Sequence, residues 1–128
     1  MSLLLDTHLL LWVAWDSPKL SEEAREILDD ADSELFFSSA SLWEIAIKTS
    51  LGRKDFQVDT RAFRQGLLDN SYSELYVTGL HAVNVDSLPL LHKDPFDRIL
   101  LAQAIHEGLT LLTSDSKLAQ YLGPVRKV

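Results

Sequence analysis

The sequence predicts an α/β fold, a three-layer sandwich in which helices cover both faces of a central, mostly parallel sheet. Short apolar runs alternate along the chain with segments whose apolar residues recur at helical spacing. The apolar pattern continues almost to the C-terminus, with no internal repeat and no linker rich in glycine, proline and serine. The chain has 128 residues, close to the commonest size of one domain. We therefore expect a single domain over residues 1–128.

The N-terminal quarter predicts a strand and two helices. The apolar run Ser2–Leu5 predicts a buried strand, and His8–Ala14 predicts a short helix. The turn sequence Asp16-Ser17-Pro18 separates this helix from the next one. Ser21 is a suitable N-cap, and two glutamates follow it in the positive first turn. An amphipathic helix is therefore expected to about Asp30.

The middle of the chain repeats the alternation. The expected elements are a strand at Leu35–Ser38, a helix at Ala40–Leu51, an exposed helix at Thr60–Leu68, a strand at Leu75–Val77 and a short helix at His81–Asp86. Ser39 or Ser41 can cap the first of these helices. Gly52 is expected to end it.

The C-terminal third predicts the most buried helix. Asp94 and Pro95 fit the N-cap and first position of a helix that Gly108 terminates. Its residues are apolar on nearly all sides, so we expect it to pack in the centre of the domain. The remaining expected elements are a strand at Leu109–Thr113, a short helix at Ser116–Leu122 and an edge strand at Val125–Val128.

Four acidic residues are placed where they can meet. Asp6 closes the first apolar run, and Asp115 follows the run that ends at Thr113. Glu44 and Asp97 each lie early in an expected helix. Strand exits and helix entries share one edge of an α/β sheet. The sequence therefore predicts one cleft lined by all four carboxylates.

Such a cluster needs protons or a cation. Two carboxylates about 5 Å apart repel by about 3 kcal/mol at an effective dielectric constant of roughly 20. A helix dipole offsets only about 0.3–1 kcal/mol. Several such repulsions would remove much of a domain's stability of roughly 5–15 kcal/mol. Because all the expected ligand atoms are oxygen, the preferred ions are Mg²⁺ or Mn²⁺.

Each acid taken alone also has a structural interpretation. Ser41 to Glu44 matches a capping box, and Glu44 can pair with Lys48 one turn later. Asp94 and Asp97 suit a helix start, and Asp115 can cap a helix that begins at Ser116. Asp6 is harder to explain in this way, because an acid directly after a buried strand gains little from burial without a cation.

Composition excludes several classes of function. The chain lacks cysteine, which removes disulfides, thiolate nucleophiles and cysteine-ligated zinc. No apolar run approaches the roughly 20 residues of a membrane span, so we expect a soluble, cytoplasmic protein. The formal net charge of −7 is the wrong sign for general nucleic-acid binding. A phosphate-bearing substrate still fits if cations neutralise the acids and local bases form a rim: Lys48, Arg53, Lys54, Lys93 and Arg98.

Four segments together resemble the PIN-domain family, and within it the VapC-type toxins of bacterial toxin–antitoxin pairs. The segments are Leu4–His8, Ser41–Lys48, His92–Ala104 and Leu112–Asp115. The resemblance covers nearly the whole chain and implies a small endoribonuclease that hydrolyses RNA phosphodiester bonds with Mg²⁺ or Mn²⁺. It further implies an antitoxin partner and a homodimer.

The resemblance also implies roles for particular residues. Asp6, Glu44, Asp97 and Asp115 are implied to be the catalytic, metal-binding acids, with Thr113 as a supporting hydroxyl. Asp94 falls in the matching stretch and is kept as a helix cap that supports the site. For Arg98, two supporting roles stay open, a contact to phosphate or a salt bridge to an acid of the cluster.

Two other classes of function remain open. The first is a non-catalytic binding module whose acidic groove accepts a basic segment of a partner protein. The second is an aspartyl phosphatase or phosphoacceptor, although Asp6-Thr7-His8 lacks the second nearby acid of such sites. The tryptophans are first of all core candidates, and Trp12 and Trp15 are also possible anchors for a partner chain. His8 and His92 flank the expected cleft, where a capping or packing role is expected.

Overall fold

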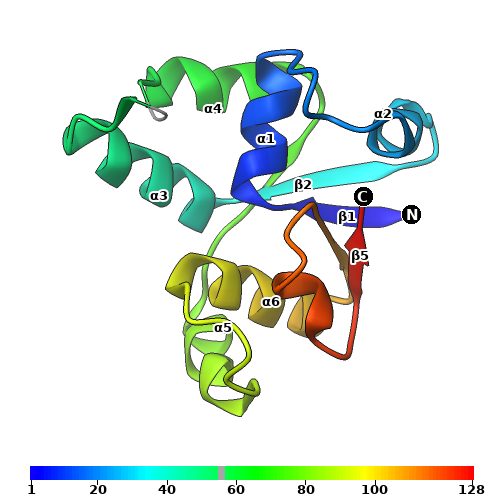
Figure 1. Ribbon diagram of the computed structural model, residues 1–128, viewed down its shortest axis with the longest axis vertical. Helices are drawn as coiled ribbons and strands as arrows, with labels where there is room; N and C mark the ends of the chain where they lie inside the picture. Colours follow the sequence, from blue (N-terminus) through cyan, green and yellow to red (C-terminus); the bar gives the residue numbers. More distant parts are fainter. Residues whose placement is uncertain (55–56) are drawn as a thin grey trace.

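The computed structural model describes residues 1–54 and 57–128, and its described strands form one five-stranded sheet in the order β3-β2-β1-β4-β5 (Figure 1). The strands are β1 (Ser2–Leu5), β2 (Glu34–Ser38), β3 (Ser73–Leu75), β4 (Thr110–Thr113) and β5 (Val125–Lys127). The helices are α1 (Thr7–Ala14), α2 (Glu22–Asp29), α3 (Ser39–Ser50), α4 (Thr60–Asp69), α5 (Gly79–Asn84) and α6 (Pro95–Glu107). Two short 3-10 helices are η2 (Val85–Ser87) and η3 (Leu118–Gln120). Every ladder between the described strands is parallel, which confirms the predicted α/β class.

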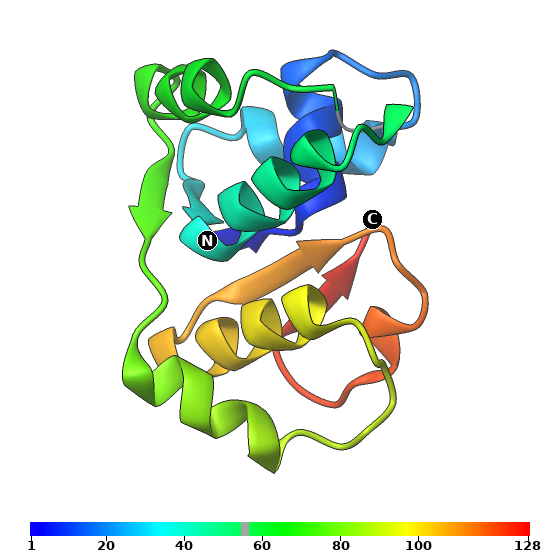
Figure 2. The same ribbon diagram turned by 90° about the vertical axis from the view of Figure 1, so that its left-hand side faces the viewer.

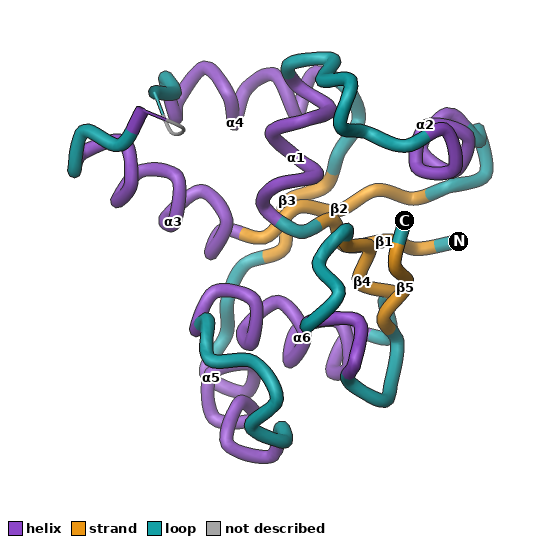
Figure 3. The backbone as a smooth tube through the Cα atoms, viewed as in Figure 1, coloured by secondary structure: helices purple, strands orange, loops and turns teal. Residues whose placement is uncertain are grey.

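Helices cover the sheet on both faces, as Figures 1 and 2 show. On one face, Leu3 and Leu5 of β1 pack against buried residues of α1, α2 and α4. On the other face, Leu4 packs against α6 and the segment around η3. Successive residues of a strand point to opposite faces, so β1 is buried on both sides and carries an unbroken leucine run. The tube in Figure 3 shows the same central strands between the two helical layers.

The strand order places a switch point between β1 and β4. The chain moves from β1 through β2 to β3 on one side, then returns through α6 to β4 and β5 on the other. Connections therefore leave the carboxyl ends of β1 and β4 in opposite directions. Ligands of open α/β sheets bind in the crevice that forms at such a point. Asp6 lies there, because its backbone N–H donates to the carbonyl of Leu112 at 3.0 Å.

The ends of α6 are where the sequence predicted them. Asp94 caps the helix by accepting from the N–H groups of Phe96 and Asp97, and Pro95 occupies the first turn. Gly108 ends it at a φ of 70°, a left-handed conformation that favours glycine. Buried residues from Leu100 to Ala104 confirm that α6 lies in the interior.

Several boundaries differ from the predictions. The strand expected at Leu75–Val77 ends at Leu75, because its partner β2 becomes a helix after Ser38 and offers no further ladder. Ser38, and neither Ser39 nor Ser41, caps α3 by accepting from Ala40 N–H.

Two short helices also differ. The helix expected at His81–Asp86 begins at Gly79, because Thr78 and His81 form a reciprocal capping box. The helix expected at Ser116–Leu122 is reduced to η3, since Gly123 and Pro124 turn the chain into β5 directly afterwards. No helix among the described residues is both long and apolar enough to span a membrane.

Candidate metal and active site

Asp6 is held at the end of β1 by two hydrogen bonds. Its Oδ1 accepts from Leu9 N–H at 2.9 Å, which makes Asp6 the N-cap of α1. Its Oδ2 accepts from the hydroxyl of the fully buried Thr113, at the end of the neighbouring strand β4. Only 4% of Asp6 is exposed. Burial raises its pKa, although the bonds from Thr113 and Leu9 and the nearby His8 act in the opposite direction.

Glu44 is fixed through both of its carboxylate oxygens. Oε1 accepts from the Thr7 hydroxyl at 2.8 Å, and Oε2 lies 2.6 Å from Lys48 Nζ. The predicted pairing with Lys48 is therefore confirmed. The capping box expected between Ser41 and Glu44 is wrong, because Ser41 lies inside α3 and its hydroxyl is 3.0 Å from that of Thr7. Glu44 is only 3% exposed, so the pair with Lys48 holds a buried carboxylate in one orientation.

Asp97 and Asp115 meet at one imidazole nitrogen. His92 Nε2 lies 2.9 Å from Asp97 Oδ2 and 3.2 Å from Asp115 Oδ2. The other ring nitrogen accepts from the backbone N–H of Asp94 at 3.3 Å. Sequence reasoning gave His92 a capping or packing role, and the structure adds a bridge between two acids. The available signal was its place five residues before Asp97, in the loop that leads into α6.

The electrostatics of Asp97 show how closely the acids converge. Its pKa is raised to about 8, first by burial and then by the negative charges of Asp94, Asp6, Glu44 and Asp115. Asp94 lies three residues before Asp97, whereas Asp6, Glu44 and Asp115 come from three distant parts of the chain, and each negative charge disfavours a further one. Contacts through Thr113, His92 and Thr7 agree with this, and they bring the four predicted acids to one edge of the sheet.

Asp115 is the most exposed of the four acids, and its surroundings act in two directions. Burial alone raises its pKa, but backbone N–H groups of Lys117 and Leu118 and the ring of His92 outweigh burial, and the pKa is lowered. The contact with Lys117 is a hydrogen bond of 2.8 Å to Oδ1. The expected helix cap at Asp115 is wrong, because η3 begins at Leu118 with Lys117 at its N-cap and no side-chain cap bond, and Asp115 instead holds the turn before it.

Thr113 and Asp94 support the acids as the sequence suggested. The Thr113 hydroxyl donates to Asp6 and accepts from the backbone N–H of Asp115 at 3.0 Å, so it links the ends of β1 and β4. Asp94 caps α6 and adds negative charge near Asp97.

Arg98 makes different contacts from those expected. Its guanidinium donates to the Tyr121 hydroxyl and to three backbone carbonyls, those of Val85, Pro89 and His92. Among the described residues, Arg98 forms no salt bridge to the acids. A contact to phosphate stays a prediction. Arg98 instead ties the 85–92 segment to α6.

The donor atoms fit a hard divalent cation. His92, Asp97 and Asp115 each offer one ligand atom, and these atoms lie within 4.8 Å of one another. Carboxylate oxygens suit Mg²⁺ and Mn²⁺, and an imidazole nitrogen is compatible with Mn²⁺. The raised pKa of Asp97 indicates the same requirement, because a cation beside it would relieve the repulsion among the acids.

The acidic edge and the parallel sheet agree with a comparison against known families. Residues 3–122 match the PIN domain. The chain belongs to the PIN-domain family. The PIN domain described here is also similar to Ribonuclease VapC22 of Mycobacterium tuberculosis, with 27% identity over 123 residues. That alignment covers 96% of this chain and 94% of the relative.

Solved structures share the fold over nearly the full length of this PIN domain. VapBC2 from Rickettsia felis, bound to a promoter DNA fragment, matches with a TM-score of 0.73 and 18% identity, covering 99% of this chain and 98% of that one. DNA-bound VapBC from Salmonella typhimurium matches with a TM-score of 0.69 and 19% identity, covering 100% and 97%. A toxin–antitoxin complex from Klebsiella pneumoniae matches with a TM-score of 0.66 and 19% identity, covering 98% of each chain. At these identities the likeness concerns the fold.

Proposed function

We propose that this PIN domain, residues 1–128, is a metal-dependent endoribonuclease that hydrolyses RNA phosphodiester bonds. The observation that carries the proposal is the convergence of Asp6, Glu44, Asp97 and Asp115 at the carboxyl edge of the sheet, with the pKa of Asp97 raised to about 8. A family relative that aligns over nearly the whole chain is named a ribonuclease, which supports RNA as the substrate.

Asp6, Asp97 and Asp115 would hold Mg²⁺ or Mn²⁺. A bound divalent ion supplies a more acidic water and stabilises charge on the phosphate oxygens. Leu9 N–H and Thr113 fix the Asp6 carboxylate, so its oxygens need no reorganisation during the reaction.

Glu44 has a separate role in this proposal. Thr7 and Lys48 hold its carboxylate in place, and we assign it the role of orienting the attacking water or contacting the ion through water. No residue needs to form a covalent intermediate.

Similarity to VapBC complexes supports a further assignment as the toxin of a toxin–antitoxin pair. In that role the PIN domain would act on RNA in the cytoplasm, bind a cognate antitoxin and form a homodimer. The antitoxin would supply a basic segment complementary to the acids. The net charge of −7 favours such a partner.

The test compares Asp6→Asn with the parent on structured RNA pools, with Mn²⁺ and with chelator. The parent is expected to cut RNA only with the metal, and Asp6→Asn is expected to lose cleavage while keeping the parent's circular dichroism. Asp32→Asn removes an exposed acid distant in sequence from the site and is the matched control. Equal cleavage by Asp6→Asn and the parent would refute the assignment. A parent that binds a basic partner and never cleaves would favour the binding module.

A further inference from the structure

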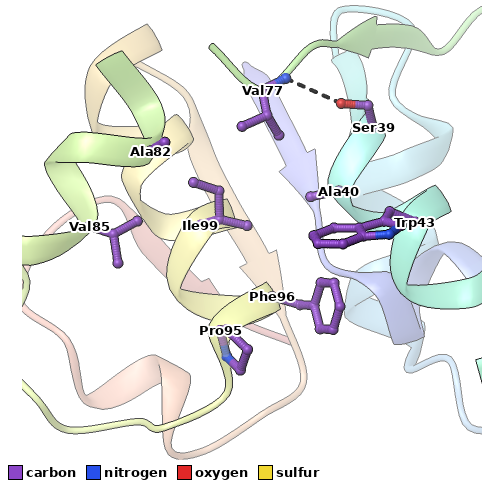
Figure 4. A pocket seen from close by; sticks show the side chains of 9 residues that line it. All are labelled: Ser39, Ala40, Trp43, Val77, Ala82, Val85, Pro95, Phe96 and Ile99. Atoms are coloured by element: carbon purple, nitrogen blue, oxygen red, sulfur yellow. Dashed lines mark hydrogen bonds between the residues drawn. The ribbon is translucent and has the colours of Figure 1, made fainter. Parts of the chain in front are cut away.

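An apolar pocket lies between α3, which carries Glu44, and α6, which carries Asp97. Its volume is about 570 Å³, and it is lined by α3 on one side and by α5, η2 and α6 on the other. We call it the Trp43 pocket, after its largest lining side chain. The other residues that line it include Ala40, Val77, Ala82, Phe96 and Ile99. Figure 4 shows the Trp43 indole facing across the pocket towards Ile99, with the Phe96 ring beside it. Small-molecule sites have volumes of about 300–1,000 Å³, so one planar group fits.

The two aromatic rings of the pocket are held in place by each other, but the pocket side of Trp43 is exposed to solvent. The rings of Trp43 and Phe96 lie 5.5 Å apart at an interplanar angle of 75°, an edge-to-face contact that fixes both orientations. Trp43 is nevertheless 64% exposed. Trp12, by contrast, packs against the core under α1. A large aromatic surface held in place and open to solvent is typical of a binding site.

The pocket adjoins the catalytic acids through the chain itself. Trp43 directly precedes Glu44 in α3, and Phe96 directly precedes Asp97 in α6. The two helices that position these acids therefore also position the aromatic pair. A phosphodiester held at the acids carries a sugar and a base on each side, so one flanking nucleotide lies within reach of the Trp43 pocket.

Charge explains why such a contact is needed. With a net charge of −7, the protein as a whole repels the phosphate backbone, and long-range attraction contributes little affinity for RNA. Stacking of a base on an aromatic ring does not depend on charge. It therefore supplies affinity that the acidic surface does not oppose.

We propose that the Trp43 pocket binds a nucleobase of the RNA strand next to the scissile phosphate. This proposal rests on the ribonuclease function proposed above. The ring of Trp43 is the stacking surface, and Phe96 holds it in position. Ser39 lines the same pocket, where its hydroxyl accepts from Val77 N–H at 3.2 Å. Among the described residues, the hydroxyl proton of Ser39 has no acceptor. This hydroxyl can therefore donate to an acceptor on the edge of the base.

The test uses the intact protein and a short RNA with one mapped cleavage site. Cleavage rates are measured for the parent, Trp43→Ala, Trp43→Phe and Trp15→Ala, the last being a matched exposed tryptophan at the end of α1. Trp43→Ala is expected to lower kcat/KM by about 5- to 150-fold, the range for loss of one stacked base. The loss should lie mainly in KM, Trp43→Phe should recover part of it, and Trp15→Ala should match the parent.

A second measurement identifies the base. Abasic nucleotides replace, one at a time, the residues on both sides of the cut. One abasic position is expected to reduce parent kcat/KM as much as Trp43→Ala does, and to cause no further loss in Trp43→Ala. Full additivity at every position would overturn the proposal.

The outcomes also separate this proposal from the function on which it rests. If the parent cuts RNA and Trp43→Ala cuts it equally well, the ribonuclease stands, the nucleobase pocket is refuted, and the apolar surface is left to a protein partner. If the parent cuts no RNA with either metal, both proposals fall. Because Trp43 is exposed, thermal unfolding of Trp43→Ala should match the parent, which excludes misfolding as the cause of a loss.

Discussion

At the scale of single residues, Asp97 shows the electrostatic cost of the site. Its pKa is raised from 3.8 to about 8 by burial and by the surrounding acids. At neutral pH the folded protein therefore retains a proton that the unfolded chain releases, which costs stability. Functional sites commonly keep such unfavourable arrangements because a ligand relieves them.

Asp97→Asn is expected to stabilise the metal-free protein at neutral pH by roughly 2–4 kcal/mol, because the amide is neutral without binding a proton. The same change should abolish metal-dependent cleavage. Urea unfolding in chelator measures the first effect, with Asp32→Asn expected to leave stability unchanged. A metal-free Asp97→Asn that is less stable than the parent would show that Asp97 has no unfavourable burial to relieve.

Thr113, unlike Asp97, contributes to stability, since its hydroxyl stabilises the charged form of Asp6 and orients Asp115. Thr113→Val keeps the shape and removes both bonds. We expect a loss of about 1–3 kcal/mol in the free energy of unfolding. The half-exposed Thr110 begins the same strand, so Thr110→Val is a matched control that should change little. Equal stability of both variants would mean that the buried hydroxyl does not hold the strand ends together.

At the scale of elements, helix starts and strand ends do the positioning. Asp6 and Asp94 are N-caps of α1 and α6, so backbone N–H groups hold their carboxylates rigidly. Glu44 instead projects from the second turn of α3 and depends on Thr7 of α1. The acids are thus attached to regular elements, which place a site more accurately than loops do.

Two glycines in different elements should respond oppositely to the same substitution. Gly108 ends α6 with a φ of 70°, and an alanine there is strained, so Gly108→Ala should destabilise the protein by about 1 kcal/mol. Gly66 lies inside α4, and a Cβ there meets no atom within 4 Å. Gly66→Ala should therefore stabilise by up to about 1 kcal/mol. Thermal unfolding of the two variants measures both shifts, and shifts of the same sign would contradict the assigned helix bounds.

At the scale of the whole molecule, the clustered acids couple metal binding, pH and stability. Between pH 3.8 and about 8, the two pKa values of Asp97, the folded state holds more protons at this group than the unfolded chain. The contribution of Asp97 to the free energy of unfolding of the metal-free protein therefore falls as pH rises through that interval. The raised pKa of Asp6 acts in the same direction above pH 3.8, whereas the lowered pKa of Asp115 acts in the opposite direction and only below pH 3.8.

Bound Mn²⁺ should reverse this trend. We expect the increase in Tm on adding Mn²⁺ to grow as pH rises between the two pKa values of Asp97, because the ion then replaces protons. Differential scanning fluorimetry with and without chelator measures the increase. Asp97→Asn should give a smaller increase that depends less on pH, and Asp32→Asn should follow the parent. An increase in Tm of the same size at every pH in the interval would show that metal binding does not depend on the ionisation of these acids.

The sequence by itself determined the class of fold and the order of the elements, and it marked four acids as candidates for the site. These properties follow from local rules. A doubly buried strand is continuously apolar, as in Leu3–Leu5, and Asp94-Pro95 and Gly108 mark the ends of α6 through backbone geometry alone. The positions of Asp6, Glu44, Asp97 and Asp115 beside strand ends and helix starts were visible for the same reason.

Only the tertiary structure decided how those residues are used. The bridge from His92 to two acids, the hydroxyl of Thr7 on Glu44, the turn of Arg98 towards backbone carbonyls and the meeting of Trp43 with Phe96 join segments that no local pattern relates. Side-chain direction depends on how α3 and α6 rotate and pack about their axes. That rotation is set by the burial of the whole apolar core, because hydrophobic packing is non-directional and acts on all elements at once.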